Sequence, residues 1–295
     1  MAMSNLAQRL ASAAVLVPAL VAALYWDPTR WSILAFATLA AGFALDEYLR
    51  MGLGVARPKA ADAESNDAAA ADASPDPTLG NETLRIVGGL GGAGIMASVG
   101  IFGAAKALPP ALTAAALLFA TAVLFQKQRL ADAGRRMAIG FTGLIYVPAF
   151  ACVWAPLKGD FSAGWLFVSL STAFLSDTTA YFAGRAFGKH KLYPEVSPGK
   201  TVEGSIGGLL GGVASVVGFG SLWLVPEIPI AHAVVLGLLG SALGQIGDLV
   251  ESMAKRTFGV KDSGNVLPGH GGLLDRVDAL LFVAPLFYYY ATLSQ

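Results

Sequence analysis

The residues best suited to chemistry lie near the C-terminal end of the chain, between positions 252 and 278. This segment carries four basic side chains, one histidine, three carboxylates and five glycines, and apolar stretches precede and follow it. Ionisable groups beside a lipid bilayer are costly and mark functional sites. Carboxylate oxygens are ligands for Mg²⁺, whereas basic side chains and backbone N–H groups bind phosphates. The segment is therefore predicted to form a site for phosphates and a metal ion.

Helical spacing places several polar side chains on shared faces. Asp248, Ser252 and Lys255 stand at positions i, i+4 and i+7 of one predicted helix, and Asp275 and Asp278 share a face of the next. Taken singly, each group could be a solvated helix end whose charges pair among themselves. Taken together, the groups favour a substrate site.

Residues 268–272 come just before a predicted helix start, where free N–H groups and the helix dipole favour an anion. His270, within this run, has two interpretations of equal weight: a hydrogen bond to the backbone or a contact with a phosphate. His190 and His232 are interpreted as ordinary polar residues.

Two polar residues earlier in the chain belong to the same predicted side. Asp177 lies roughly one or two turns before the end of its predicted helix, where an uncompensated carboxylate is expensive. It is predicted to meet a residue of another helix or a metal ion, and a hydrogen bond to neighbouring hydroxyl groups is the alternative. Lys200 lies in a basic stretch suited to an anionic lipid head group. The run 199–201 is not a P-loop, because Pro194 stands where that motif requires glycine.

The elements that must position these residues have the composition of a membrane protein. Hydrophobic residues make up 55% of the chain, charged residues 14%, and the mean hydropathy is +0.60, unlike an ordinary soluble domain. A membrane-spanning helix needs about 20 mainly apolar residues. Nine candidate spans satisfy this, at 10–26, 31–49, 86–105, 108–125, 137–157, 163–183, 204–225, 230–250 and 273–293. The predicted fold class is an all-α, polytopic integral membrane protein with about nine transmembrane helices.

The distribution of lysine and arginine tests this count, because short cytosolic loops are rich in basic residues. With a cytosolic N-terminus and alternating spans, 17 of the 20 basic residues lie on the cytosolic side. Only Arg30, Lys106 and Lys158 lie outside. The chain is therefore predicted to be a multi-pass protein of the cytoplasmic (cell) membrane, with its N-terminus and active site facing the cytosol.

Residues 56–82 differ from the rest, with six acids against two bases among Ala, Asp, Ser, Asn and Pro. They are predicted to form a disordered acidic cytosolic linker. The predicted organisation is helices 1 and 2 in 1–55, the linker in 56–82, helices 3 to 5 in 83–160, and catalytic helices 6 to 9 with cytosolic loops in 161–295.

Glycine and cysteine receive structural interpretations. Gly208 and Gly212 lie four positions apart in an apolar run, which favours close helix packing or dimer contacts, whereas a nucleotide-binding glycine loop follows a strand. Cys152 is the only cysteine, so it cannot form an internal disulfide. It is interpreted as a small packing residue.

Residues 252–278 resemble the signature of the phosphatidate cytidylyltransferase (CDP-diacylglycerol synthase) family, S-x-apolar-K-R-x4-K-D-x-small-x2-L-P-x-H-G-G-x-x-D-R-x-D. The match departs from the pattern only mildly, at Ala254. The run D-x-x-A-Y-x-x-G-R at 177–185, the run S-P-x-K-T-x-E-G at 197–204 and Arg9 before the first span are also similar. The resemblance covers the chain outside the acidic linker.

The resemblance implies condensation of CTP with phosphatidic acid to CDP-diacylglycerol and pyrophosphate, for phospholipid synthesis. It implies Mg²⁺ as cofactor, K⁺ as an accompanying cation, a homodimer, and no nucleic-acid partner. Asp248 and Asp275 are the implied metal ligands, with Asp278 and Ser252 in support. The remaining candidates contact phosphates: Lys255, Arg256, Lys261 and Arg276 neutralise the triphosphate, His270, Gly271 and Gly272 cradle it, and Lys200 attracts phosphatidate.

Other protein classes share some of these features. A transporter also carries intramembrane acids and glycine-rich spans, but it often repeats its two halves, and no repeat is evident. A CDP-alcohol phosphotransferase carries D-G-x-x-A-R, whereas Thr178 follows Asp177 here. A nucleotide-using lipid kinase stays open on the residues alone, which do not reveal the nucleotide.

Overall fold

A computed structural model describes residues 22, 25, 30–54, 79–126, 130–264 and 271–294. Of the first predicted span, 10–26, only Ala22 and Tyr25 are described. Arg9, His270 and most of the predicted linker lie outside the described residues.

The described residues are helical almost throughout, as the all-α prediction requires. The helices are α2 (Trp31–Gly54), α3 (Leu79–Phe102), α4 (Ala104–Leu124), α5 (Leu130–Leu144), α6 (Trp154–Pro156), α7 (Ala163–Phe187), α8 (Val202–Ser215), α9 (Ile230–Thr257) and α10 (Leu274–Leu293). Three π-helical segments directly follow α5, α6 and α8, at Ile145–Ala149, Leu157–Phe161 and Val216–Leu224 respectively. Two short strands, β1 (Lys191–Tyr193) and β2 (Ser197–Thr201), form an antiparallel hairpin between α7 and α8.

Six helical segments of the described part are long and apolar enough to cross a membrane. The chain is therefore a multi-pass membrane protein. Helices α7 and α10 form where the sequence predicts them, but they carry polar residues such as Asp177 and Asp275 and are not among the six. The predicted count of nine is not confirmed.

Helix α3 begins at Leu79, inside the range 56–82 predicted as linker, so residues 79–82 are helical. Glu82 lies in the first turn of α3, where the helix dipole favours a carboxylate. Asn81 Nδ2 donates to the carbonyl oxygen of Leu53, 3.1 Å away, and so ties the start of α3 to the end of α2.

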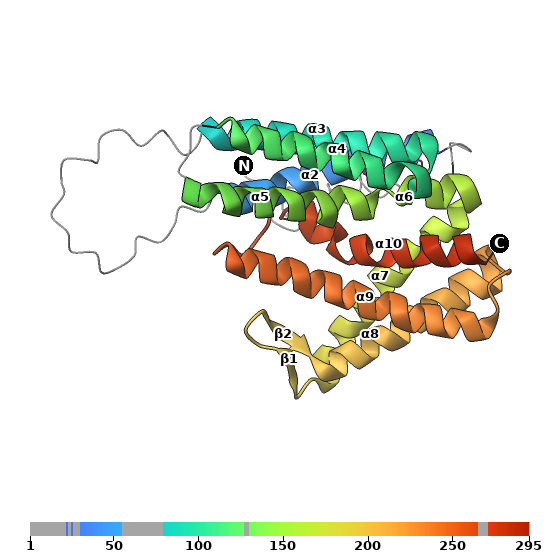
Figure 1. The fold of residues 1–295 in the computed structure, drawn as a ribbon. Helices are drawn as coiled ribbons and strands as arrows, with labels where there is room; N and C mark the ends of the chain where they lie inside the picture. The colour runs from blue at the N-terminus through green and yellow to red at the C-terminus, as the bar shows by residue number, and fades with distance from the viewer. Residues whose placement is uncertain are drawn as a thin grey trace, which may run out of the picture.

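The long helices pack in two groups (Figure 1). Helices α2, α3, α4 and α5 lie together in one group, and α7, α8 and α9 form the other. Helix α10 contacts α9, α7 and also α2, so it joins the two groups. The β1–β2 hairpin packs beside α8 and α9.

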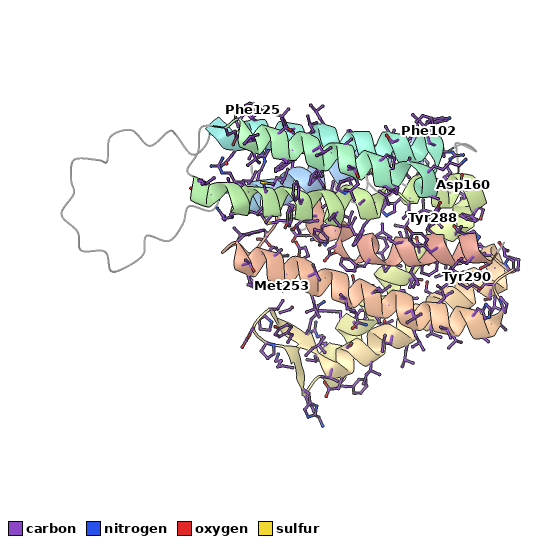
Figure 2. All side chains as sticks on the ribbon, viewed as in Figure 1. Phe102, Phe125, Asp160, Met253, Tyr288 and Tyr290 are labelled. Atoms are coloured by element: carbon purple, nitrogen blue, oxygen red, sulfur yellow. The ribbon has the colours of Figure 1, made fainter. Side chains whose placement is uncertain are left out.

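The helix ends segregate as alternating spans require. Figure 2 places Phe125 and Met253 at one end of the bundle, and Phe102, Asp160 and Tyr290 at the other. In the predicted topology the first two residues border cytosolic segments and the others border external ones. Which end faces the cytosol stays a prediction.

Close packing explains the glycine spacing in α8. A Cβ atom on Gly208 would lie 2.8 Å from Gln245 Nε2, and one on Gly212 would lie 2.7 Å from the carbonyl oxygen of Gly237. Both neighbours belong to α9, so the packing interpretation is confirmed. Cys152 is buried and donates from Sγ to the carbonyl oxygen of Ala149 at 3.0 Å, as a packing residue would.

Candidate active site

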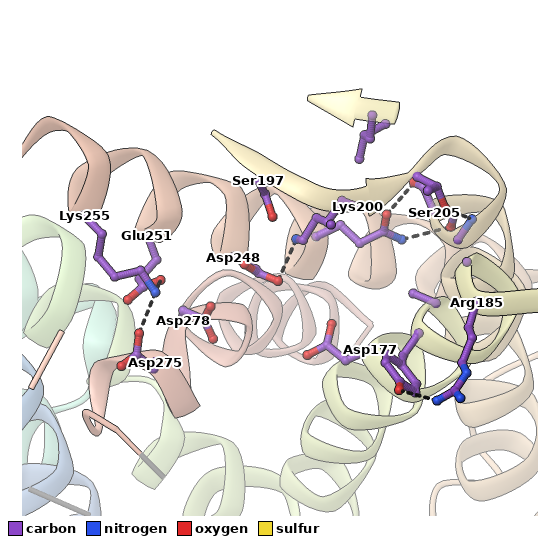
Figure 3. A pocket seen from close by; sticks show the side chains of 18 of the residues that line it. Asp177, Arg185, Ser197, Lys200, Ser205, Asp248, Glu251, Lys255, Asp275 and Asp278 are labelled. Carbon is purple, nitrogen blue, oxygen red and sulfur yellow. Dashed lines mark hydrogen bonds and ion pairs between the residues drawn. The ribbon is translucent and has the colours of Figure 1, made fainter. Parts of the chain in front are cut away.

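A pocket of about 600 Å³ is lined by the hairpin, α7, α8, α9 and the start of α10 (Figure 3). Its volume is in the range of small-molecule sites. Six of the residues predicted from the sequence line it together: Lys200, Asp248, Lys255, Asp275, Arg276 and Asp278. Segments from residue 177 to residue 278 thus converge on one cavity.

The hairpin brings Lys200 to α9. Thr201, the last residue of β2, begins α8 by accepting a hydrogen bond at Oγ1 from Gly204 N at 3.1 Å. Lys200 Nζ then lies 2.6 Å from Asp248 Oδ2. The residue predicted to attract the lipid phosphate therefore forms an ion pair with a predicted metal ligand.

The two described histidines have structural partners. His190 Nδ1 lies 2.7 Å from Glu203 Oε1, and Glu203 also accepts from Lys189 N at 3.0 Å, which fixes the entry to the hairpin. His232 Nδ1 lies 2.9 Å from the hydroxyl of Tyr290. These contacts agree with the ordinary roles predicted for both.

Asp177, Asp248 and Asp278 line the pocket together with Asp275. Asp177 is exposed to it, and its carboxylate interacts electrostatically with Asp248 and Lys200. Asp278 is 8% exposed and also interacts with Asp248. Ser252 Oγ donates to Asp248 Oδ1 at 3.3 Å. Asp177 therefore lines the same pocket as residues of the hairpin and α9, and a direct partner for its carboxylate stays a prediction.

Lys255 bridges two carboxylates at the other end of the pocket. Its Nζ lies 2.5 Å from Glu251 Oε2 and 2.6 Å from Asp275 Oδ1. Glu251 is 2% exposed, and its Oε1 has no hydrogen-bond partner within the described part of the chain. Glu251 was not predicted from the sequence, although its i, i+4 spacing to Lys255 is a signal for a helical ion pair.

The second oxygen of Asp275 organises the connection between α9 and α10. Asp275 Oδ2 accepts from Ser263 N at 3.1 Å, Ser263 Oγ at 2.9 Å and Gly272 N at 3.0 Å. Gly271 has φ +78°, a conformation that favours glycine. Because Gly272 N–H already donates to Asp275, its predicted phosphate contact would require this bond to be exchanged.

The other candidates among the described residues lie outside the pocket lining: Ser252, Arg256, Lys261, Gly271 and Gly272. Arg256 Nη1 donates to the carbonyl oxygen of Val260 at 3.3 Å, and Lys261 is exposed. Their assignments to phosphates stay predictions.

Glu47 of α2 also contacts the α9–α10 connection, and the sequence analysis missed it. Its carboxylate accepts from Leu273 N at 3.0 Å and from Leu274 N at 2.8 Å. The sequence signal was an acid within an apolar run, which is costly unless it has a partner.

The donor set of the pocket fits a hard divalent cation. Magnesium binds through one or two carboxylates together with water and substrate phosphates, and the pocket offers several carboxylates beside basic groups. Among the described residues, no group of three or more His, Cys, Asp or Glu is placed to hold a metal. A site of two carboxylates, completed by phosphate oxygens, is the arrangement that fits.

Comparison with known proteins gives a family and several relatives. The model of the cytidylyltransferase family matches residues 83–294. A phosphatidate cytidylyltransferase of Bacillus subtilis (strain 168) is 46% identical over 125 residues, which cover 42% of this chain and 46% of that protein. Those of Staphylococcus haemolyticus and Staphylococcus aureus (strain COL) are 52% and 53% identical over 113 and 114 residues, in each case 38% of this chain and 43% of the relative. The matches thus span less than half the length of these relatives.

Proposed function

The chain belongs to the cytidylyltransferase family, and on that premise we propose that it transfers the cytidylyl group of CTP to phosphatidic acid. The products are CDP-diacylglycerol, a precursor for phospholipid synthesis, and pyrophosphate. The curated relatives that support this choice carry the name phosphatidate cytidylyltransferase.

The observation that carries the proposal is the composition of the pocket wall. Lys200, Asp248, Lys255 and Asp275 line one cavity at the end of a bundle of apolar helices. A lipid phosphate can approach such a cavity along the membrane, and a soluble nucleotide can approach it from water. The two substrates therefore have separate routes to one site.

The reaction needs little proton transfer. A phosphate oxygen of phosphatidate attacks the α-phosphorus of CTP, the bond from that phosphorus to the bridging oxygen breaks, and pyrophosphate leaves with the electron pair. The second pKa of a phosphate monoester is about 6, so the nucleophile is already ionised at neutral pH and no general base is required. Catalysis then rests on positioning and charge neutralisation.

The basic side chains of the pocket supply that neutralisation. In this proposal Lys200 holds the phosphate of phosphatidate, and Lys255 and Arg276 contact the triphosphate of CTP. Arg256, Lys261, His270, Gly271 and Gly272 are proposed to contact the triphosphate from the α9–α10 connection. The contact of Gly272 requires its N–H group to exchange the hydrogen bond to Asp275 for one to a phosphate oxygen.

The carboxylates would hold the metal. Asp248 and Asp275 are the proposed Mg²⁺ ligands, with Asp278 and Ser252 in support, and K⁺ is proposed as an accompanying cation. When bound, Mg²⁺ neutralises phosphate charge and helps to orient the reacting groups. The proposal also includes a homodimer in the cell membrane with the pocket facing the cytosol, where CTP is available.

The test uses the chain of 295 residues in lipid-containing micelles with labelled nucleotide and phosphatidate. CTP, dCTP, ATP, GTP and UTP are compared, and lipid product and pyrophosphate are quantified separately. We expect equal amounts of CDP-lipid and pyrophosphate, formed from the cytidine nucleotides alone. Phosphorylated lipid from ATP, or solute uptake into vesicles without CTP turnover, would instead support a kinase or a transporter.

A further inference from the structure

Glu47 lies outside residues 83–294 of the family match, yet its carboxylate reaches the α9–α10 connection. The side chain is 2% exposed. Oε1 accepts from Leu273 N at 3.0 Å, while Oε2 accepts from Leu274 N at 2.8 Å and from Ser263 Oγ at 3.2 Å. One buried carboxylate from α2 therefore connects residue 263 with residues 273 and 274.

The start of α10 depends on carboxylates from elsewhere. The first N–H groups of a helix need acceptors that the helix does not supply. The side chain of Leu273, at the N-cap, is apolar and cannot accept a hydrogen bond. Two carboxylates supply these acceptors. Glu47 accepts from the N–H groups of residues 273 and 274, and Asp275 accepts from that of Gly272 just before them. A negative charge here also interacts favourably with the helix dipole.

Ser263 links the two carboxylates. Its hydroxyl lies 3.2 Å from Glu47 Oε2 and 2.9 Å from Asp275 Oδ2. The other oxygen of Asp275, Oδ1, accepts a hydrogen bond from Lys255 Nζ at 2.6 Å in the pocket wall. The contacts thus run from α2, behind the pocket, to a side chain that lines it.

Two glycines make room for the Glu47 carboxylate. For a Cβ atom on Gly264, the three nearest atoms would all belong to Glu47, with Cδ at 2.8 Å and Cγ at 2.9 Å. A Cβ atom on Gly272 would lie 2.7 Å from Glu47 Oε2. A larger residue at position 264 would displace the carboxylate, and one at position 272 would collide first with Ser263 Oγ, so the two glycines, Ser263 and Glu47 form one packed unit.

We propose that Glu47 is a positioning residue for the cytidylyl transfer. It fixes the first turn of α10 and Ser263 so that Asp275 presents Oδ1 to Lys255 in the pocket. Glu47 is not part of the pocket lining, so it acts through Asp275. This inference rests on the proposed function, and its test separates the two.

The first variant is Glu47→Gln, whose amide nitrogen cannot accept a hydrogen bond, so at least one donor loses its acceptor. We expect folded protein whose kcat falls about 10- to 100-fold, as for other residues that orient ligands without touching substrate, with the KM for phosphatidate unchanged. Glu47→Asp keeps the charge but withdraws it by one methylene, and it carries the same test if Glu47→Gln does not fold. Asp46→Asn is the matched control on α2, because Asp46 pairs with Arg50 and Arg85 instead.

A double-mutant cycle tests the contact itself. Gly264→Ala should lower kcat by displacing the carboxylate, and combining it with Glu47→Ala should cause little further loss, because the added methyl group then has space. Gly42→Ala on α2, where a Cβ atom would meet nothing within 4 Å, is the control.

Hydrogen exchange of the amides at residues 273 and 274 gives a readout independent of turnover, and it should accelerate in Glu47→Gln. An inactive wild-type enzyme with normal slow exchange would refute the proposed function and leave the contact intact. The positioning role would be overturned by additive losses in the cycle, by a kcat of folded Glu47→Gln within twofold of wild type, or by activity that only follows the folded fraction.

Discussion

Lys255 of α9 and Asp275 of α10 form an ion pair in the pocket wall, with Nζ 2.6 Å from Oδ1. The same ammonium lies 2.5 Å from Glu251 Oε2, and both Lys255 and Asp275 have side chains 12% exposed. Two carboxylates therefore share one cation in a place that water reaches poorly. The group has a net negative charge when all three are ionised, which favours an additional cation.

Replacing Asp275 with asparagine should abolish most activity. The amide keeps the size of the side chain but loses the charge that pairs with Lys255 and, in our proposal, binds metal. We expect CDP-lipid formation to fall by at least about 100-fold, the scale of losing a well-placed electrostatic group, while insertion and folding stay normal. The exposed residue Asp262 gives the control Asp262→Asn. Near wild-type turnover in Asp275→Asn would contradict the metal assignment.

Truncating Glu251 should reduce stability. Removing one partner of a buried ion pair costs about 3–5 kcal/mol of stability. We expect the loss in Glu251→Ala to lie at the lower end of this range, because Lys255 still pairs with Asp275. Unfolding in mixed micelles measures the loss. Glu195 is exposed in the hairpin, and Glu195→Ala should be neutral. Equal stability of the two variants would show that the Glu251 pair contributes nothing.

Lys200 should determine the affinity for the lipid substrate. A hydrogen bond to a charged group contributes about 1.5–3 kcal/mol, so Lys200→Ala should raise the KM for phosphatidate about tenfold or more and change the KM for CTP less. Lys200→Arg should recover part of the loss. Lys189→Ala, an exposed lysine of the same connection, is the control. A selective rise in the KM for CTP would move Lys200 to the nucleotide.

Gly211 should tolerate no side chain. A Cβ atom there would collide with the side chain of Thr179 on α7, and overpacking of this kind costs about 1–3 kcal/mol. Gly211→Ala should therefore lower the unfolding temperature. At Gly218 a Cβ atom would meet nothing within 4 Å, so Gly218→Ala should leave the unfolding temperature unchanged. An unaffected Gly211→Ala would mean that α7 and α8 can separate without cost.

Removal of divalent cations should stop turnover reversibly. Chelation should abolish CDP-lipid formation, and added Mg²⁺ should restore it, because phosphates and two carboxylates together form the proposed ligand set. In Asp248→Asn the Mg²⁺ concentration for half-maximal activity should rise at least tenfold. Activity that persists through exhaustive chelation would rule out the metal.

The sequence predicted the helices better than their ends. Apolar runs located every described long helix, because burial in lipid requires about 20 such residues. The ends depend on contacts that no local pattern reveals. Helix α3 starts early because Asn81 bonds to Leu53, and α9 continues to Thr257 past the predicted limit at 250.

The site was predictable where its residues follow helical spacing. Lys255, Asp275 and Asp278 were identified that way, and the structure brings them to one pocket. Glu47 was not, because it lies 226 positions from Leu273, its hydrogen-bond partner. At the start of α10 the N–H groups of residues 272 to 274 donate to the carboxylates of Asp275 and Glu47, and the predicted phosphate contact of this run stays a prediction.

The contact between Glu47 and the start of α10 joins two segments that are far apart in the chain. Helix α2 precedes α10 in the chain, so Glu47 is synthesised long before residues 273 and 274, whose N–H groups donate to its carboxylate. Until then it is an acid in an apolar helix without its native hydrogen bonds. A chain that stalls before α10 therefore lacks Asp275, Arg276 and Asp278 of the pocket wall, and it leaves the Glu47 carboxylate without the two N–H donors that satisfy it in the complete bundle.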